Sequence, residues 1–523
     1  MKGIVKKVGG LAAAAVLATG VVACSAGGAG GASGPPIVGG DFHVAWNAQP
    51  PTLDPVASTA YAVRDIANNV FEGLVAMDAK YQPQPVLAQS YTVSPDHTKF
   101  DFTLRTDVTF HNGQAMTVDD VLASINRWIS DSVIGKQFFT GSQVTSPGPN
   151  MVRIAAPQKL FTGLELLADP SQPLVVMPAT AIAKKGPAGV TDIIGTGPYQ
   201  FVDWRKDQYI QLKKFPGYKS PSGPTSGLAG EKKPMVDNLF FDVVPDASTR
   251  LSGLQTSQYK MAFNMATDNA AQLQGDPTLT QIAEPGNFTG VVFNKKAGPM
   301  ADLNLRKAVL AAIDPKAILQ AGYASDEFFK LNGALSQPEM AGSYTQAGLD
   351  GYAKPDPAKA KQLLQQSGYQ GQALRFLTTH DYDYMYNGAV VIQQELKAIG
   401  VNVDLVVTDW ATVLANRVKP EAYDMFITGW SFEPTPLAYT FLQPTWAGWT
   451  DNPAMRQAMV AVNGSANEQE AKTHYDELQQ AFYDYVAIAK FGDVSALTGM
   501  KKSVGGYNHL VGPILYNVYE TQQ

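Results

Sequence analysis

Hydrophobic and polar positions alternate with a strand-like period early in this 523-residue chain. Residues 98–110 (TKFDFTLRTDVTF) place phenylalanine or leucine at every second position over their first half, and Val and Phe again near their end. A period of two predicts half-buried strands. Thr117 and Asp120 then have the spacing of a capping box, and the apolar residues from 121 to 129 share one helical face, so we predict a helix there.

Residues 374 to 430 alternate strand and helix patterns. Strand patterns lie at 374–378, 401–407 and 423–428, and helical patterns lie between them at 388–399 and 411–418. This order predicts a βαβαβ unit with a parallel sheet. In open sheets of this kind, ligands bind beyond the carboxyl ends of the strands.

Polar and aromatic residues follow each of these three predicted strands. His380 and Asp381 follow the first strand, Trp410 follows the second, and Trp430 follows the third. We therefore expect them to meet at one edge of the sheet as candidate ligand-binding residues. Six aromatic residues lie between 430 and 449, and they would form a stacking wall for a ligand, with at least two of them expected in the core.

The N-terminus has the layout of a secretory signal. Three lysines precede an uncharged run from 8 to 23, which is shorter than the about 20 apolar residues of a membrane-spanning helix. The stretch Val21-Val22-Ala23-Cys24 resembles the lipobox of bacterial lipoproteins. This resemblance implies a signal peptide at 1–23, a lipid on Cys24 and a membrane anchor through that lipid.

Two alternatives exist for Cys24: it lies inside an ordinary signal peptide, or it is a free thiol. On the lipoprotein interpretation, residues 24–40 form a flexible tether, because their glycine-rich sequence lacks the apolar mass to pack. Multiple acyl chains give stable anchoring. The protein would then be extracytoplasmic and lipid-anchored to the outer face of the plasma membrane.

Composition narrows the classes of function. The formal net charge of −6 leaves no basic surplus for nucleic acid, so we expect no such partner. The chain exceeds one ordinary core, which predicts two or three structural units. Its one cysteine excludes intramolecular disulfides, so stability must come from packing, for which 45% hydrophobic residues suffice.

Catalytic signatures are weak. The sequence has no Walker loop, HExxH, GxSxG or GxGxxG, and its six histidines show no pair at zinc-binding helical spacing, so we expect neither a metal nor a cofactor. Ser257 and Lys260 match the SxxK pattern of acyl-serine enzymes, which keeps a hydrolase as an alternative. Two fixed letters often match by chance, and no KTG element is present, so we predict that the protein is not an enzyme.

Several runs occur together in one order along most of the chain. They are PTLDP (51–55), FEGLVAMD (71–78), residues 85–113, MTVDDVLAS (116–124), GTGPYQFVDW (195–204), LRKAVLAAID (305–314), PDPAKAKQLLQQSGY (355–369), QQELKAIGVNVDLVVTDW (393–410) and YDMFITGW (423–430). With these runs the chain resembles the extracytoplasmic solute-binding proteins of ABC importers, family 5, the oligopeptide, dipeptide and nickel class.

The resemblance implies an α/β fold with two lobes, the periplasmic-binding-protein-like fold of type II in its large class, with an inserted subdomain and two hinge crossings between the lobes. Mapped by motif order, the first lobe, lobe I, comprises 41–73, 194–285 and 493–523. The inserted subdomain comprises 74–193, and the second lobe, lobe II, comprises 286–492.

The resemblance also implies a function. The protein, as a monomer, would capture a small ligand between its lobes and deliver it to ABC permease subunits with their ATPases. A peptide is the leading expectation for this ligand. Carbohydrate or another polar organic solute is the alternative. Nickel is a weaker option, because chelated metal favours histidine and His380 stands alone near the proposed site.

Peptide-binding members of the family anchor the ligand's amine with an aspartate after the third strand's Gly-Trp. In this chain Thr435 stands at that position, and Glu433 is the nearest carboxylate. Either Glu433 or Asp381 would replace the aspartate, or the ligand has no amine there, because a buried ammonium needs a paired carboxylate. Phe432 joins the candidates from this lobe, and Tyr61 is the candidate from the opposite one.

Overall fold

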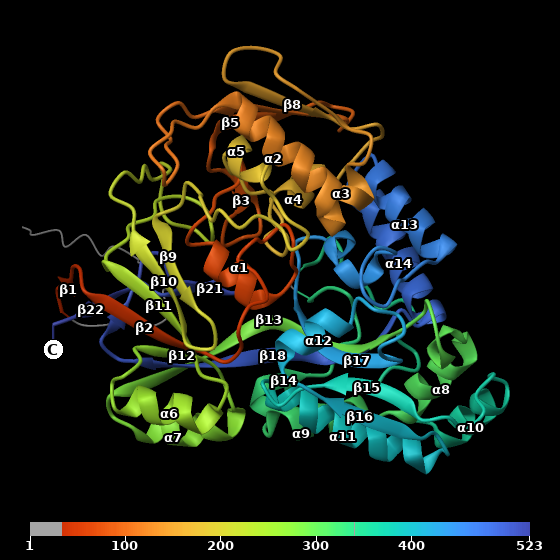
Figure 1. Cartoon of the computed structure of the whole chain (residues 1–523). Coiled ribbons are helices and arrows are strands. Elements are labelled where there is room, and N and C mark those ends of the chain that lie inside the picture. The colour runs from red at the N-terminus through yellow and green to blue at the C-terminus, as the bar shows by residue number, and fades with distance from the viewer. Residues whose placement is uncertain (1–33, 339, 523) are drawn as a thin grey trace, which may run out of the picture.

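The computed structural model describes residues 34–338 and 340–522. The predicted signal peptide and Cys24 lie outside the described residues. Within the described residues, 11 strands form one mixed sheet that runs through the whole molecule (Figure 1). In spatial order they are β16 (Val403–Val407), β15 (Leu374–Thr378), β17 (Met425–Ser431), β13 (Leu279–Phe293), β18 (Ile488–Lys501), β12 (Met261–Met265), β2 (Asp41–Trp46), β11 (Asn238–Val243), β10 (Tyr209–Lys214) and β9 (Tyr199–Arg205), and β14 (Phe329–Lys330) pairs with β18.

The long strands β13 and β18 belong to both halves of this sheet. The first part of β13 pairs with the last part of β18, which also pairs with β12. The last part of β13 pairs with β17 and with the first part of β18. The register shifts between Glu284 and Asn287, and Gly286 there has φ +106°, a conformation that favours glycine. Two lobes are thus joined by two strands, and the predicted boundaries at 285/286 and 492/493 fall inside them.

The parallel unit predicted in lobe II is present. β15 pairs in parallel with both β16 and β17. The helix after β15 begins at Asp383, earlier than the predicted 388. The helices of this lobe are α8 (Leu303–Ala312), α9 (Pro315–Tyr323), α10 (Pro357–Gln365), α11 (Asp383–Ala398), α12 (Trp410–Asn416), α13 (Pro453–Gly464) and α14 (Glu468–Tyr485). Side chains cap several of them: Asp314 accepts a hydrogen bond from the Lys316 backbone at the start of α9, next to a proline at the first helical position.

Lobe I combines its half of the sheet with a few short helices and the C-terminal segment. The helices are α1 (Tyr61–Ala67), α6 (Ala247–Gln255) and α7 (Ala270–Gly275). Short strands near the two termini are β1 (Pro36–Ile37), β19 (Val504–Gly505), β20 (Asn508–His509), β21 (Pro513–Ile514) and β22 (Tyr519–Thr521), of which β1, β22 and β19 form one sheet. Helix α1 is buried along most of its length, so this part of lobe I lies inside the molecule.

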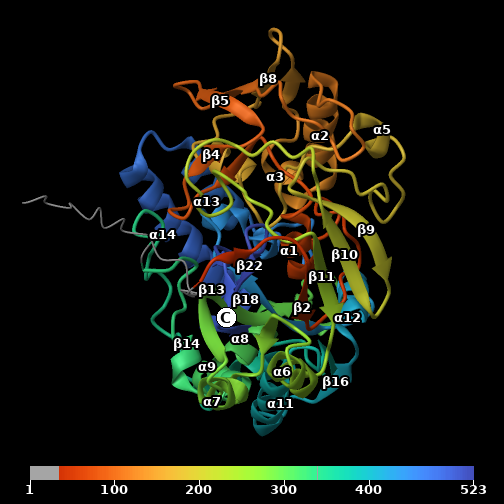
Figure 2. The same ribbon diagram turned by 90° about the vertical axis from the view of Figure 1, so that its left-hand side faces the viewer.

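The inserted subdomain covers the sheet from above in the view of Figure 1, and Figure 2 shows it on the same side after a quarter turn. Its strands are β3 (Val75–Met77), β4 (Pro83–Pro85), β5 (Ala88–Val93), β6 (Lys99–Leu104), β7 (Gln143–Thr145) and β8 (Met151–Ala155), and its helices are α2 (Val118–Asp131), α3 (Val133–Phe138), α4 (Gly163–Leu167) and α5 (Ala179–Ile182). Its sheet has the order β5-β6-β8-β7.

Two predictions in this subdomain have different outcomes. The capping box at Thr117 and Asp120 is formed, and it begins α2. The alternating pattern of 98–110 gives a strand over its first part, but near residues 108–110 the backbone makes an isolated bridge from Thr109 to Ala115. Val108 and Phe110 are nevertheless buried. An apolar pattern of period two therefore occurs here without a continuous strand.

Across the described ranges, no helix combines the length and the apolar character needed to cross a bilayer.

Candidate ligand-binding site

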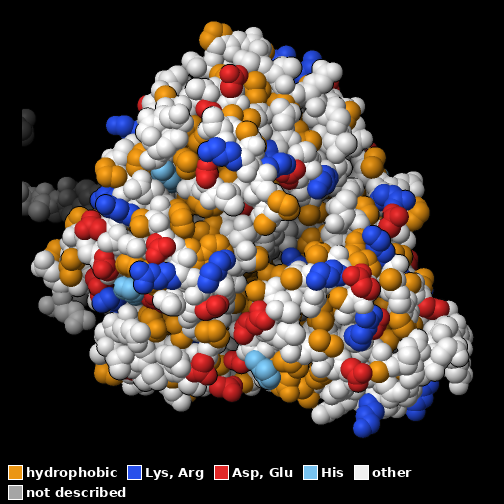
Figure 3. Space-filling model, in the orientation of Figure 1, with side chains coloured by type: hydrophobic (Ala, Val, Ile, Leu, Met, Phe, Trp, Pro, Cys, Tyr) orange, Lys and Arg blue, Asp and Glu red, His pale blue; other side chains and the backbone are white. Residues whose placement is uncertain are grey.

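A cavity lies where the two lobes and the crossing strands β13 and β18 meet. It holds about 930 Å³ of space free of protein atoms, its open mouth included. Lobe I contributes Trp46, α1, the end of β12 and residues 509–513, and lobe II contributes the end of α9, residues 382–384 and the end of β17. Figure 3 shows a face that is hollowed near its centre and on which acidic and basic side chains are interspersed.

A buried ion pair from α1 lies on the lobe I side of this cavity. Arg64 Nε donates to Asp65 Oδ1 at 2.6 Å, and Arg64 Nη1 donates to Ser431 Oγ of lobe II at 3.1 Å. Burial raises the pKa of Asp65 to about 6 against the opposing effect of the guanidinium. Gly512 packs against this pair, and a Cβ there would lie 2.3 Å from Arg64 Nη2 and from Asp65 Oδ1.

Glu284 lines the cavity from the first half of β13. The Tyr507 hydroxyl donates to Glu284, and His509 Nε2 lies 3.6 Å from its other carboxyl oxygen. Burial raises the pKa of Glu284 to about 8 and lowers the pKa of His509 to about 3. At neutral pH this part of the wall therefore presents a largely protonated carboxyl group and a neutral imidazole.

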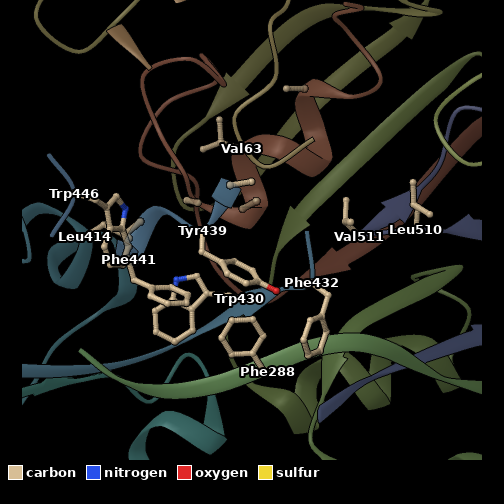
Figure 4. Close-up of a cluster of buried hydrophobic side chains, with 14 of the residues drawn as sticks. Val63, Phe288, Leu414, Trp430, Phe432, Tyr439, Phe441, Trp446, Leu510 and Val511 are labelled. Carbon is tan, nitrogen blue, oxygen red and sulfur yellow. The ribbon is translucent and has the colours of Figure 1, made fainter. Parts of the chain in front are cut away.

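Aromatic side chains form the lobe II side. Tyr323 and Tyr384 stack with ring centroids 5.5 Å apart, and Trp430 stacks on Phe288 at 5.4 Å. Phe288 is also contacted by Phe432, Tyr439 and Phe441, which are buried, and Figure 4 shows these rings gathered around it. Most of the aromatic residues expected to form a stacking wall are therefore core, and Trp430 and Trp446 are the two of them that line a cavity.

A second pocket adjoins the first. The two share Tyr61, Tyr382, Tyr384, Gly429 and Trp430. The second pocket is otherwise lined by Thr59, Ala60, Met385, Trp410, Arg417, Thr428, Thr440 and Trp446. Arg417 Nη2 donates to Thr59 Oγ1 at 3.0 Å, and Trp446 Nε1 lies 3.3 Å from the same hydroxyl, so lobe II contacts lobe I here.

A third contact between the lobes lies at the outer rim, and we call it the rim contact. Asn463 of α13 accepts hydrogen bonds through Oδ1 from the Thr162 backbone at 3.2 Å and from the Thr162 hydroxyl at 2.9 Å. The Phe161 backbone donates to the Asn463 carbonyl oxygen at 3.0 Å. The inserted subdomain therefore holds lobe II on the side of the cavity away from the crossing strands.

The structure brings together some of the residues predicted from the sequence. Tyr61 and Trp430 line both pockets, and Trp410 lines the second one. His380 and Asp381 line neither: the His380 ring contacts Tyr386 at 3.9 Å, and Asp381 Oδ2 accepts from the Trp410 backbone at the start of α12. The loop after β15 instead turns Tyr382 and Tyr384 towards the cavity.

The segment after β17 also lies outside the lining of both pockets. Phe432 is in the buried cluster around Phe288, and the Thr435 hydroxyl lies 2.9 Å from the Tyr475 hydroxyl. Glu433 is buried, and burial together with Asp169 raises its pKa well above the usual range. The segment continues into a short 3-10 helix (Pro436–Ala438), whose residues are buried and line neither pocket. Neither Glu433 nor Asp381 is thus placed to hold a ligand amine within this cavity.

The charged residues of the cavity were not found by reasoning from the sequence. Arg64 and Asp65 interrupt an otherwise apolar helix, YAVRDIA, and this interruption was an available signal. Glu284, Arg417 and His509 belong to no local motif, because the fold assembles them from distant positions. In the part of the chain that the structure describes, no group of three or more His, Cys, Asp or Glu side chains is arranged to hold a metal ion.

Comparison with known proteins decides the family. The model of "bacterial extracellular solute-binding proteins, family 5 Middle" matches residues 82–453. The chain belongs to this family. A family 5 protein binds a solute outside the cytoplasm, and the two-lobed architecture agrees with that role.

Relatives of this family 5 protein are similar over most of their length. The chain is 27% identical over 509 residues to a probable peptide ABC transporter periplasmic-binding protein of Sinorhizobium fredii, covering 89% of this chain and 91% of the relative. It is 28% identical over 406 residues to the glutathione-binding protein of Escherichia coli O157:H7, covering 75% of each.

Solved structures confirm the predicted fold class. The binding protein AgaA of A. tumefaciens, in complex with agropinic acid, superposes with a TM-score of 0.81 at 24% identity and covers 92% of this chain and 99% of that one. The oligopeptide-binding protein AppA of Bacillus subtilis, with a nonapeptide, superposes with a TM-score of 0.79 at 20% identity and covers 93% and 100%. The family 5 fold is therefore established for nearly the whole described chain.

Proposed function

We propose that this family 5 protein captures a peptide in the cavity between its lobes and delivers it to the permease subunits of an ABC importer, whose ATPase partners supply the energy. The observation that carries the proposal is the cavity itself, which is lined from both lobes and closed by hydrogen bonds between them. A ligand that contacts both lobes stabilises the closed state more than the open one.

Charge in the cavity supports a peptide over a neutral sugar. Arg64 and Asp65 are charged groups of this lining, whereas Glu284 is largely protonated at neutral pH, and a peptide brings one ammonium and one carboxylate to be matched. Relatives named for peptide and glutathione binding support the same class. Several of the rings expected to form a stacking wall after β17 are buried in the core, and the aromatic lining of the two pockets comes largely from other segments, through residues such as Tyr61, Tyr382 and Tyr384. Such rings suit the side chains of a peptide as well as the faces of a sugar.

Binding without turnover is part of the proposal. Ser257 is exposed on the turn after α6, and Lys260 Nζ pairs with Glu520 at 3.1 Å. A serine nucleophile needs a base within hydrogen-bond reach, and the lysine of the SxxK match is occupied by another partner. The geometry therefore favours a binding protein over an acyl-serine hydrolase.

Native mass spectrometry tests the ligand class. The purified protein is incubated with an equimolar mixture of tripeptides, and in parallel with a mixture of di- and trisaccharides. We expect adducts with tripeptide masses, a higher melting temperature and a smaller radius of gyration in solution scattering. Saccharide adducts without peptide adducts would refute the proposed ligand class. A scattering profile that a bound peptide leaves unchanged would refute the proposed closure of the lobes.

We further propose that the mature chain is a monomer held at the outer face of the plasma membrane by a lipid on Cys24. The apolar leader before that residue supports it. Wild-type protein should fractionate with membranes and be degraded by protease added to cells with the wall removed. The Cys24→Ala variant should appear in the extracytoplasmic soluble fraction, and light scattering should give it the mass of one chain. Equal membrane retention of both proteins would contradict the lipid anchor.

A further inference from the structure

Another large cavity lies within lobe II, and we call it the lobe II pocket. It holds about 1430 Å³ of space free of protein atoms, its open mouth included. Its lining comes from α8, residues 348–356, α10, the end of α14 and the start of β18. Figure 1 shows α8 and α10 at the end of lobe II that is remote from β9, β10 and β11 of lobe I.

The lobe II pocket is separate from the site between the lobes. Within the described ranges, none of its lining residues lines the cavity between the lobes or the second pocket. All of them lie between residues 307 and 490, so one lobe supplies the whole lining. Opening and closure of the two lobes therefore leave this pocket intact.

Much of the pocket wall is apolar. The wall includes aliphatic side chains and tyrosine rings, namely Leu310, Ile313, Leu363, Val486, Tyr352 and Tyr483. The Tyr352 hydroxyl donates to the Phe491 carbonyl oxygen, and the Tyr483 hydroxyl donates to the Gly333 carbonyl oxygen at 2.7 Å. Because both hydroxyl groups are bound to the backbone, the two tyrosines offer the pocket the apolar faces of their rings.

One charged side chain of the lining, Lys490, is fully buried and already has its partners. Its Nζ donates to Asp493 Oδ1 at 3.0 Å and to the Ala334 carbonyl oxygen. A buried charge needs a paired counter-ion, and here the protein supplies one. The inner part of the pocket therefore requires no charged group from a ligand.

The exposed part of the lining, which we call the mouth, carries a different set of charges. It has three lysines and two aspartates, namely Lys307, Lys354, Lys359, Asp356 and Asp484. Asp356 caps α10, and Asp484 accepts from Gln480 Nε2 at 3.1 Å. Among the described residues, none of the three lysines forms an ion pair with an acid. The mouth therefore holds positive charge that is free to meet an anion.

We propose that the lobe II pocket binds an amphipathic carboxylate, such as a fatty acid of medium chain length, with its chain along the apolar wall and its carboxylate at the lysines of the mouth. Burial of the chain supplies affinity in proportion to the apolar area removed from water, and a lysine ammonium meets a carboxylate as a point charge. This binding goes beyond the capture of a peptide between the lobes and is independent of it.

The first test varies the ligand. Calorimetry measures the affinities of hexanoate, octanoate, decanoate and the neutral decanol, on the full chain with Cys24→Ala so that no detergent competes for the pocket. Affinity should rise roughly tenfold for every two methylenes, because each added methylene is buried. Decanoate should bind roughly 3- to 10-fold more tightly than decanol, as expected for a carboxylate beside partly exposed lysines.

The second test varies the charge of the mouth. Lys307→Glu should weaken decanoate binding roughly 3- to 10-fold and leave decanol binding unchanged, since the alcohol carries no charge. Lys361→Glu is the matched control, because Lys361 is an exposed lysine of α10 that lies outside the lining. It should leave both affinities as they are.

The third test fills the pocket. Ala311→Trp places a large ring at the wall and should weaken decanoate and decanol alike, at least about 10-fold, because it takes the space of the chain. Ala358→Trp, at an exposed position of α10 outside the lining, is the control and should bind both as before. Circular dichroism and melting temperature verify that each variant is folded.

Photolabelling locates the bound molecule. Decanoate with a diazirine in its chain should label residues 307–315, 348–363 and 480–490, and labelling of residues that line the cavity between the lobes instead would overturn the proposal. It would also be wrong if the chain bound no alkane carboxylate, or if folded Ala311→Trp kept the full affinity. Equal affinities for decanoate and decanol would refute the role of the lysines. A failure of tripeptide binding would leave this inference unaffected, because the two sites share no lining residue among those described.

Discussion

The two sides of the cavity join the lobes in different ways. On the crossing side, the continuous strands β13 and β18 belong to both lobes and are packed against the buried cluster around Phe288. On the rim side, the inserted subdomain meets α13 through the side chain and backbone of Asn463. A covalent connection with a packed core persists in every state of the protein, whereas a few hydrogen bonds can break when the cavity opens.

Buried carboxyl groups occur on both sides, in different settings. Glu284 lies on the crossing side with Tyr507 and His509. Glu433 of lobe II and Asp169 of the inserted subdomain influence each other electrostatically. Burial raises the pKa of Asp169 to about 6 and raises that of Glu433 well above its usual range. From the different connections on the two sides, we expect the crossing side to determine the stability of the fold. We expect the hydrogen bonds of the rim side to determine how readily the cavity opens.

Phe288→Ala should have the largest effect, because it removes the centre of the packed cluster on the crossing side. We expect the free energy of unfolding of lobe II to fall by about 3–5 kcal/mol, the range for a large aromatic residue truncated in a core. Chemical denaturation followed by tryptophan fluorescence measures it. Phe240→Ala, a partly exposed ring of lobe I, is the matched control and should cost about 1 kcal/mol. Similar losses in both variants would contradict the proposed importance of the crossing side.

Glu284→Gln should remove a pH dependence of stability on the crossing side. Burial raises the pKa of Glu284 from 4.5 to about 8. Its contribution to the free energy of unfolding is therefore complete below about pH 4.5, where the group is protonated in both states, and is lost as pH rises from there through about 8. We expect the wild type to lose about 2–4 kcal/mol of unfolding free energy between pH 5 and pH 8.5 from this group, and the variant to lose correspondingly less. Denaturation curves across that range measure the difference.

Partly exposed Glu231 provides the control for this experiment, since Glu231→Gln should leave the pH profile as in the wild type. Asp65, His509 and Tyr507 surround Glu284 and remain in both variants. A profile for Glu284→Gln that is superimposable on that of the wild type would show that Glu284 titrates near its ordinary pKa in the folded protein.

Asn463→Ala should have the smallest effect, and it should act on opening instead of unfolding. It removes two side-chain hydrogen bonds of the rim contact, worth about 0.5–1.5 kcal/mol each. We expect a larger radius of gyration without ligand, peptide affinity roughly 5- to 30-fold weaker, and an unchanged denaturation midpoint. Thr162→Ser keeps the hydroxyl and should behave as the wild type. A shifted denaturation midpoint together with an unchanged scattering profile would contradict the roles assigned to the rim side and the crossing side.

Local patterns in the sequence predicted much of the fold. The parallel strands β15, β16 and β17 follow from apolar runs of the right length, and the helix starts at Thr117 and Asp314 follow from capping residues. Such signals are short-range, because a cap or an alternating strand is determined by residues within a few positions of each other. The two-lobed class was carried by resemblance, since no local rule indicates that β13 and β18 pass through both lobes.

The cavity was less accessible to sequence reasoning. Tyr61, Trp410 and Trp430 were predicted and do line the two pockets, and their role in ligand binding remains a prediction. Asp381 was chosen for its position after a strand, but its carboxylate binds the backbone at the start of α12. Glu433 was chosen as the nearest acid in sequence, but it is buried and does not belong to the lining of either pocket. Burial and orientation of loop residues depend on tertiary packing that a motif does not encode.

The sparse cysteine content and the rim contact together make this protein suitable as an optical reporter. Cys24 is the sole cysteine in the sequence, so replacing it leaves a chain with no native thiol. New thiols placed near Thr162 and Asn463, which line neither pocket, would then accept a donor dye on the inserted subdomain and an acceptor dye on lobe II. Energy transfer between them would follow each capture and release event in a single molecule while the recognition surface stays unmodified.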